Sequence, residues 1–112
     1  MPTSCIVPWN EAAARRHAAG FMMPFVNRES CGARQITTHV SVIDPGQTAH
    51  PPHEHAGEEV MFVLEGEGEF SAGGEKYRVG PMTALFCPEH VLHGLRNTGA
   101  APIKYVVFRV VA

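Results

Sequence analysis

The residues best suited to chemistry lie in segment 53–59, His-Glu-His-Ala-Gly-Glu-Glu, which combines two imidazoles with several carboxylates. In an extended chain alternate side chains share a face, so His53 and His55 are expected to point the same way. A tight turn at residues 56–57, Ala-Gly, then brings the Glu59 carboxylate round to join them. Together these three side chains offer three donors for one divalent ion.

A fourth donor is expected from segment 88–94, Pro-Glu-His-Val-Leu-His-Gly, in which His93 is the best candidate. Mixed imidazole and carboxylate ligands suit transition metals, whereas Ca²⁺ and Mg²⁺ prefer all-oxygen shells. The set His53, His55, Glu59 and His93 therefore predicts a divalent transition metal (Fe, Mn, Ni, Zn, Co or Cu) without selecting one. In octahedral coordination two positions would stay open for water, O₂ or a substrate.

Glu58 competes with Glu59 for the carboxylate position. If Glu59 faces the interior, strand alternation carries Met61 and Val63 inward with it and turns Glu58 toward solvent. The expected pocket is largely apolar and is lined by Met61, Val63 and Phe86.

Two further histidines, His50 and His90, are close in sequence to the candidate ligands. Imidazole titrates near neutral pH, so either could act as a proton shuttle, and either could equally be a residue at the rim. The rim fits His50 better, whereas His90 is the catalytic candidate. Cys87 is interpreted as a small buried hydrophobe, because no helix N-terminus or basic neighbour in the sequence would lower its pKa.

The chain from Ala33 onward has the pattern of β-strands. Strands are expected near residues 36–43, 60–64, 83–87 and 103–111, and glycines 73 and 74 indicate a hairpin. Short strands separated by glycine turns, without helices between them, predict an antiparallel sandwich or barrel. On the first strand the phase that contains Val40 looks more like core, which places His39 at the surface or at an interface.

Residues 1–33 differ in composition and predict an extension that packs on the barrel or at a dimer interface. Residues 10–20 predict a short helix with Asn10 as its N-cap and Gly20 as its C-terminal stop. The apolar run 21–26 follows, and Pro24 argues against a central strand there.

Length and charge limit the classes of partner. The chain has 112 residues, a net charge of -2 and no run of Lys or Arg, which indicates one soluble domain without nucleic-acid or membrane partners. The first five residues do not resemble a signal peptide, so a cytoplasmic protein is expected. The three cysteines (Cys5, Cys31 and Cys87) are odd in number and widely spaced, as expected for reduced thiols.

Two linked motifs make the sequence resemble the cupins. The first is Gly46, His53-x-His55, three residues, Glu59, six residues and Gly66, and the second is Gly80, Pro88, His93, three residues and Asn97. The resemblance covers about residues 34–110. The interval from Gly46 to His53 is one residue longer than the usual pattern, and His90 stands where the family usually has glycine.

The resemblance implies an all-β fold, a small antiparallel jelly-roll β-barrel over residues 34–112 with the metal inside, preceded by a short helical or extended segment. It also implies the ligand set His53, His55, Glu59 and His93, and a homodimer. The N-terminal segment 9–26, which is rich in apolar residues, could supply the dimer contact.

The ligand set leaves several functions open. The first hypothesis is a metal-dependent enzyme that acts on a small oxygenated molecule by dioxygenase-type oxidation, ahead of isomerase, lyase or decarboxylase chemistry. The second is a non-catalytic binder of metal and small ligand. A sugar isomerase or epimerase ranks last, because such enzymes usually need His with Tyr or Lys facing the sugar, and residues 76–77 and 104–105 have uncertain phase.

Overall fold

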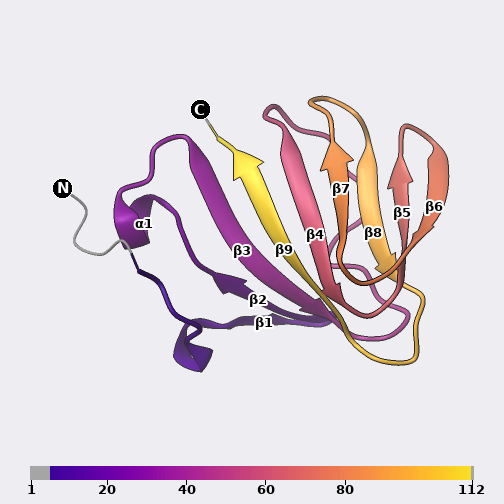
Figure 1. Cartoon of the computed structure of the whole chain (residues 1–112), viewed down its shortest axis with the longest axis horizontal. Helices are drawn as coiled ribbons and strands as arrows, with labels where there is room; N and C mark the ends of the chain where they lie inside the picture. The colour runs from indigo at the N-terminus through magenta and orange to yellow at the C-terminus, as the bar shows by residue number, and fades with distance from the viewer. Residues whose placement is uncertain (1–5, 112) are drawn as a thin grey trace.

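Two antiparallel β-sheets form the molecule in a computed structural model that describes residues 6–111 (Figure 1). The larger sheet has six strands in the order β1 (Arg15–His17), β2 (Gly20–Pro24), β3 (Ile36–Ile43), β9 (Ile103–Val110), β4 (Glu59–Glu65) and β7 (Thr83–Cys87). The smaller sheet has three, in the order β6 (Glu75–Val79), β5 (Gly68–Ala72) and β8 (His93–Asn97). The only helical elements in the described part are η1 (Glu11–Ala13) and α1 (Arg28–Cys31).

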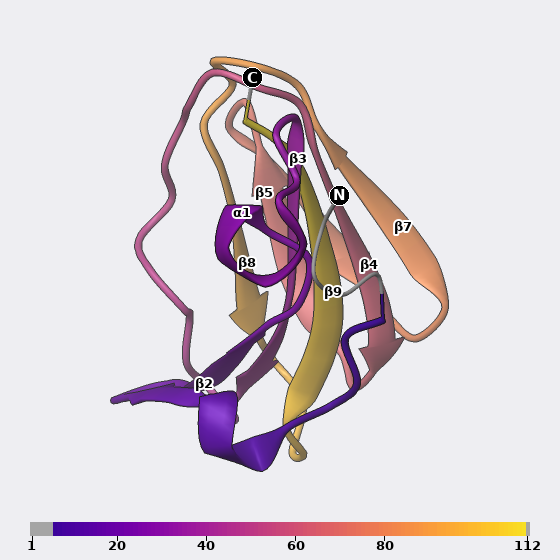
Figure 2. The ribbon, with the colours of Figure 1, turned by 90° about the vertical axis from the view of Figure 1, so that its left-hand side faces the viewer.

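The predicted all-β, jelly-roll type of fold is confirmed. The smaller sheet lies behind the larger one when the molecule is seen from the side (Figure 2), and the sheets remain separate rather than closing into a fully hydrogen-bonded barrel. No helix in the described range 6–111 is long and apolar enough to cross a membrane.

Alternation along the central strands fills the space between the sheets. On β4 the side chains of Glu59, Met61 and Val63 are buried, as the sequence predicted, while the residues between them are more exposed. On β9 the matching set is Ile103, Tyr105 and Val107, all at 4% exposure or less. The core therefore lies directly beneath the strand that carries the candidate carboxylate.

The predicted position of His39 is wrong. Thr37, His39 and Ser41 face the space between the sheets, where they line a cavity. Val40 is also buried, but it lies on the opposite face of β3, next to Met23 of β2. Side chains on both faces of β3 are shielded from solvent, so the apolar face of this strand was not a guide to the side on which the cavity lies.

The N-terminal segment packs its Trp9 ring against residues on and just after β2. The Trp9 ring lies 6.1 Å from the Phe21 ring and 6.2 Å from the Phe25 ring. The Lys104 ammonium lies 4.9 Å from the Trp9 ring centroid, an arrangement that cation–π attraction favours. This contact keeps aromatic surface of residues 9–25 within its own chain.

The predicted helix over residues 10–20 is wrong beyond its first turn. Asn10 does cap a turn, since its side chain accepts a hydrogen bond from the Ala12 amide, but η1 ends at Ala13. Strands β1 and β2 follow and pair as a hairpin, and β2 pairs with β3, so the predicted extension adds two strands to the larger sheet.

Pro24 does not exclude a strand, contrary to the expectation from sequence. It is the last residue of β2, and β1 ends before reaching it, because β1 pairs only with residues 20–22. The missing proline N–H therefore costs no hydrogen bond to β1.

Candidate metal centre

The candidate ligands come from two connections that hydrogen bonds hold together. His53 and His93 exchange backbone N–H to carbonyl hydrogen bonds of 2.9 Å in both directions. The His90 N–H donates to the His55 carbonyl at 2.9 Å, and the Gly57 N–H donates to Glu89 Oε2 at 2.7 Å. The connection before β4 is thus fixed against the one between β7 and β8, which is the positional precision that a metal site needs.

Gly57 makes the turn that the sequence predicted ahead of Glu59. Its φ is +86°, a left-handed value, and a Cβ at this position would lie 2.0 Å from the Val110 carbonyl oxygen. Only glycine combines that φ with so close a backbone approach. The turn delivers Glu59 to the first position of β4 with its side chain facing inward.

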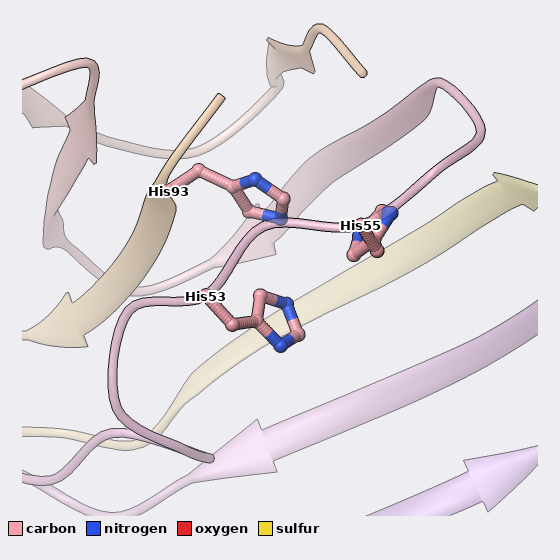
Figure 3. A group of neighbouring side chains, drawn as sticks. All are labelled: His53, His55 and His93. Carbon is pink, nitrogen blue, oxygen red and sulfur yellow. The ribbon is translucent and has the colours of Figure 1, made fainter. Parts of the chain in front are cut away.

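Three histidine rings converge at one point between the sheets (Figure 3). The rings of His53, His55 and His93 lie 4.9 to 5.1 Å apart, centroid to centroid, and are close to mutually perpendicular. One nitrogen from each ring lies within 4.8 Å of the others. Three edges turned toward a common centre are the arrangement that a shared ion requires.

The hydrogen bonds of two rings fix their tautomers. His55 Nδ1 lies 3.0 Å from the Ala56 carbonyl oxygen, and His93 Nδ1 lies 2.9 Å from the Val91 carbonyl oxygen. A carbonyl can only accept, so each Nδ1 carries the proton and donates it. In the neutral ring Nε2 is then left with a free lone pair, the form in which histidine binds metals.

Glu59 faces these two lone pairs directly. Its Oε1 lies 3.1 Å from His55 Nε2, and its Oε2 lies 3.6 Å from His93 Nε2. His93 is 1% exposed, and its Nε2 is a buried polar atom without a hydrogen-bond partner. His55 Nε2 can donate to Oε1 only when it carries a proton, and His93 Nε2 has no hydrogen-bond partner. A cation between these nitrogens and the carboxylate would satisfy all of them, so the residues fit a divalent metal.

His53 completes the cluster from the more open side. Burial, followed by the neighbouring histidines His50, His93 and His55, lowers its pKa below the ordinary value, so the ring is neutral at pH 7. Glu58, the competitor of Glu59, is exposed, as alternation predicted. The structure therefore brings together all four residues that the sequence proposed as ligands.

Cys87 lies against the same cluster and is fully buried, as expected. Its Sγ is within 4.8 Å of donor atoms of Glu59 and His93. Burial, with a smaller contribution from Glu59, raises the pKa of this thiol to about 12. A protonated thiol is a weak metal ligand, and Cys87 acts here as packing behind the carboxylate.

A cavity of about 400 Å³ opens in front of His53 and Glu59. Met61 lines it, as predicted, but Val63 and Phe86 do not. Val63 is fully buried in the core, and the alternation of β7 turns Phe86 outward, where it is 52% exposed. The wall opposite the cluster is polar, with Thr37 and Ser41 on β3, and is more polar than the sequence led us to expect.

Three further cavity residues were missed in the sequence: His39, Tyr105 and Arg109. Burial lowers the pKa of His39, and although Glu59 opposes this, His50 and Arg109 add to it, so its imidazole is neutral at pH 7. Burial raises the pKa of the Tyr105 phenol to about 12 although its side chain is hydrogen-bonded to Ser41. The spacing of Ile103, Tyr105, Val107 and Arg109 at every second residue was the signal that could have placed the last two.

His50 and His90 are both exposed, at different places around the cluster. The His50 ring stacks on His53 at 3.9 Å and lines the cavity, so it is a rim residue in contact with a candidate ligand. His90 lies in the turn between β7 and β8 with φ +59°, the left-handed region where glycine is favoured. It is not one of the residues that line the cavity.

Two sheets enclosing a cluster of three histidines and one glutamate define a class of small β-sandwich with an internal metal-type site. Residues 39–109 match the family described as Cupin domain, and the chain therefore belongs to this family. An uncharacterized protein of Aquifex aeolicus is 33% identical over 63 residues, 55% of this chain and 52% of that protein. The chain thus spans about half the length of this curated relative.

Solved structures agree on the fold. A predicted oxalate decarboxylase from Thermotoga maritima superimposes with a TM-score of 0.83 at 20% identity, over 96% of this chain and 99% of that one. The polyketide cyclase RemF from Streptomyces resistomycificus gives a TM-score of 0.73 at 23% identity, over 88% and 67%. At these identities the likeness establishes the shared fold and not a shared activity.

Proposed function

We propose that this protein is a metal-dependent enzyme that acts on a small oxygenated organic molecule, and that its reaction is a dioxygenase-type oxidation. The observation that carries the proposal is the Glu59 carboxylate facing the Nε2 atoms of His55 and His93, at 3.1 and 3.6 Å, beside a cavity of about 400 Å³. Such a cavity has the volume of an ordinary small-molecule site.

The ion would be held by His53, His55, Glu59 and His93. A redox-active ion held there would supply electron transfer between substrate and O₂, and a redox-inert one would supply Lewis acidity. The chain itself supplies a partly apolar chamber, in which Met61 and Val107 exclude water from the substrate. His39 offers a neutral imidazole in the same chamber, where it can accept or return a proton.

A redox-neutral isomerase, lyase or decarboxylase is the second candidate. The observation in its favour is that two groups able to move a proton, neutral His39 and protonated Tyr105, line the cavity. Oxidation by O₂ does not require such a pair, whereas bond cleavage or isomerisation next to a carbonyl does. The resemblance in fold to a predicted oxalate decarboxylase is compatible with this candidate.

Oxygen consumption separates these functions. Protein loaded anaerobically with Fe²⁺ is mixed with diketones, catechols or flavonols, and O₂ uptake is followed after air is admitted, with zinc-loaded protein as the control. Uptake that requires both iron and one of these substrates supports the oxidation. Conversion of substrate by the zinc form without O₂ would favour the redox-neutral candidate, and no conversion by either form would favour a binding protein.

His90 is proposed as an acid–base residue, and His39 competes for that role from within the cavity. The variants H90G and H39Q decide between them. If His90 transfers the proton, H90G lowers kcat strongly while substrate binding persists. If H90G is fully active and H39Q is not, the role belongs to His39.

We also propose that the protein forms a homodimer in the cytoplasm. Phe86 and Phe108 are 52% and 48% exposed on the outer face of the larger sheet, where each pairs with Val60 of β4. Adjacent exposed aromatics favour coverage by a second copy. The free thiols of Cys31 and Cys87 suit a reducing compartment. Light scattering should give twice the chain mass, and F86S/F108S should give the monomer mass.

A further inference from the structure

We propose that Arg109 is the substrate-anchoring residue of this site and that the substrate is a small carboxylate with a second oxygen group that reaches the metal. The inference deepens the proposed function and rests on it. Its starting point is Arg109, which lines the cavity and has no ion-pair partner among residues 6–111.

Arg109 is placed beside the metal cluster by strand register. It pairs with Glu59 on β4 and with Thr37 on β3, and directly paired side chains on one face lie side by side. All three residues line the cavity of about 400 Å³. Arg109 therefore reaches the same space as the candidate metal ligands.

The charge of Arg109 is not neutralised by any described residue. Among residues 6–111 no carboxylate lies within ion-pair distance of its guanidinium, and its Nε is a buried polar atom without a hydrogen-bond partner. Arginine stays charged at any physiological pH, and a half-buried charge without a partner is destabilising. Such a group fits a site whose partner arrives with the ligand.

The two carboxylates that share a cavity with Arg109 are engaged elsewhere. Glu59 points its oxygens at His55 and His93. Glu89 shares a smaller hollow with Arg109, but its Oε2 accepts the Gly57 N–H at 2.7 Å, and it forms no ion pair with any residue of the described range. Neither carboxylate is available to Arg109 without giving up a contact that holds the site together.

The charges of the cavity define the ligand class. Arg109 is the only arginine or lysine among the lining residues, and Glu59 is the only acid. A divalent ion, one carboxylate and one guanidinium sum to two positive charges, which a carboxylate with a second acidic oxygen group offsets. A planar carboxylate also matches the two parallel N–H bonds of a guanidinium and leaves the second oxygen group of the ligand free to reach the metal.

The test uses lactate and malonate as probes and their neutral amides, lactamide and malonamide, as matched controls. Zinc-loaded protein, labelled with ¹⁵N at arginine, is titrated with each probe while the Nε–H signal of Arg109 is followed, identified by its loss in R109Q. Calorimetry with the wild type, R109Q and R96Q measures zinc and probe affinities. Arg96 is exposed on β8 and faces away from the cavity, so R96Q makes the same charge change outside the site.

We expect the acids, and not the amides, to shift the Arg109 signal. R109Q should weaken binding of the acids by about 10- to 100-fold, the effect of losing a charge-assisted hydrogen-bonded pair. Zinc affinity should persist in R109Q, and R96Q should bind like the wild type. Equal binding of the acids by R109Q and the wild type, or equal binding of acids and amides, would overturn the inference.

Failure of the proposed function gives a different result. If the wild type binds no metal, the metal-dependent function is wrong, and the titration is then read in the metal-free protein. A carboxylate-specific shift of the Arg109 signal in that form would still support Arg109 as an anion anchor. Absence of the shift in both forms would overturn it.

Discussion

Replacement of Glu59 by glutamine is the sharpest perturbation of the site, because it removes a charge and leaves the shape of the side chain. In the metal-free protein the glutamine amide can donate to an unprotonated Nε2 of His55 or His93, whereas the carboxylate can only accept and therefore needs a ring protonated at that atom. The metal-free E59Q protein should therefore be at least as stable to unfolding as the metal-free wild type.

The effect of metal on stability should move the opposite way. At a free zinc concentration of 100 times the wild-type Kd, binding adds about 2.7 kcal/mol to the free energy of unfolding. Loss of residues that merely support a ligand weakens metal binding by about 10- to 100-fold, so loss of a direct ligand should cost at least about 100-fold. At the same zinc concentration E59Q would then gain only about 0.4 kcal/mol.

Urea unfolding with zinc and with EDTA measures both quantities. The matched control is E58Q, one residue earlier, where the side chain is exposed and faces away from the cluster. E58Q should gain as much from zinc as the wild type. The reasoning is refuted if E59Q gains as much as the wild type, or if E58Q loses the gain equally.

Three further predictions follow from the turn before β4, from a buried amide and from a buried phenol. G57A should destabilise the fold by more than about 2 kcal/mol and weaken zinc binding, whereas G74A, at φ +87° with nothing within 4 Å of its Cβ, should cost only about 1 kcal/mol in urea unfolding. Asn97 is fully buried and makes three hydrogen bonds to backbone groups, so N97A should lose about 3 kcal/mol in the same assay, and a loss below about 1 kcal/mol would contradict this account. In Y77F protein the remaining phenol is Tyr105, and its ultraviolet absorbance should show ionisation only near pH 12. Because the pKa of Tyr105 is higher in the folded than in the unfolded protein, the stability that it contributes is complete below pH 10 and declines between pH 10 and 12. Y77F/Y105F protein should lack this decline.

The strands and the inward residues of β4 could be predicted because their signals are local. Alternation places Glu59, Met61 and Val63 on one face of the strand, whichever strands pair with it. The turn before it could be predicted because Gly57 is a glycine, which tolerates positive φ. The placing of His93 beside His53 needed the resemblance as well, since residues far apart in sequence meet only through the paired connections.

The positions of His39, Phe86 and Arg109 depended on what covers each face of the larger sheet. The apolar phase of β3 is buried on the face away from the cavity, at Val40 beside Met23 of β2, so that phase resembled an interior. The helix expected over residues 10–20 failed for a related reason. Its alanines favour a helix, but pairing with β2 and β3 captures residues 15–17 as a strand.

The central claim is that His53, His55, Glu59 and His93 bind one transition-metal ion. The most direct measurement is an anomalous difference map from crystals of the protein loaded with zinc or iron, recorded at the absorption edge of the metal. The account predicts one peak per chain at about 2.0 to 2.2 Å from a nitrogen of each histidine and an oxygen of Glu59. A map without that peak, or one in which His93 Nε2 is turned away from the other donors, would contradict it.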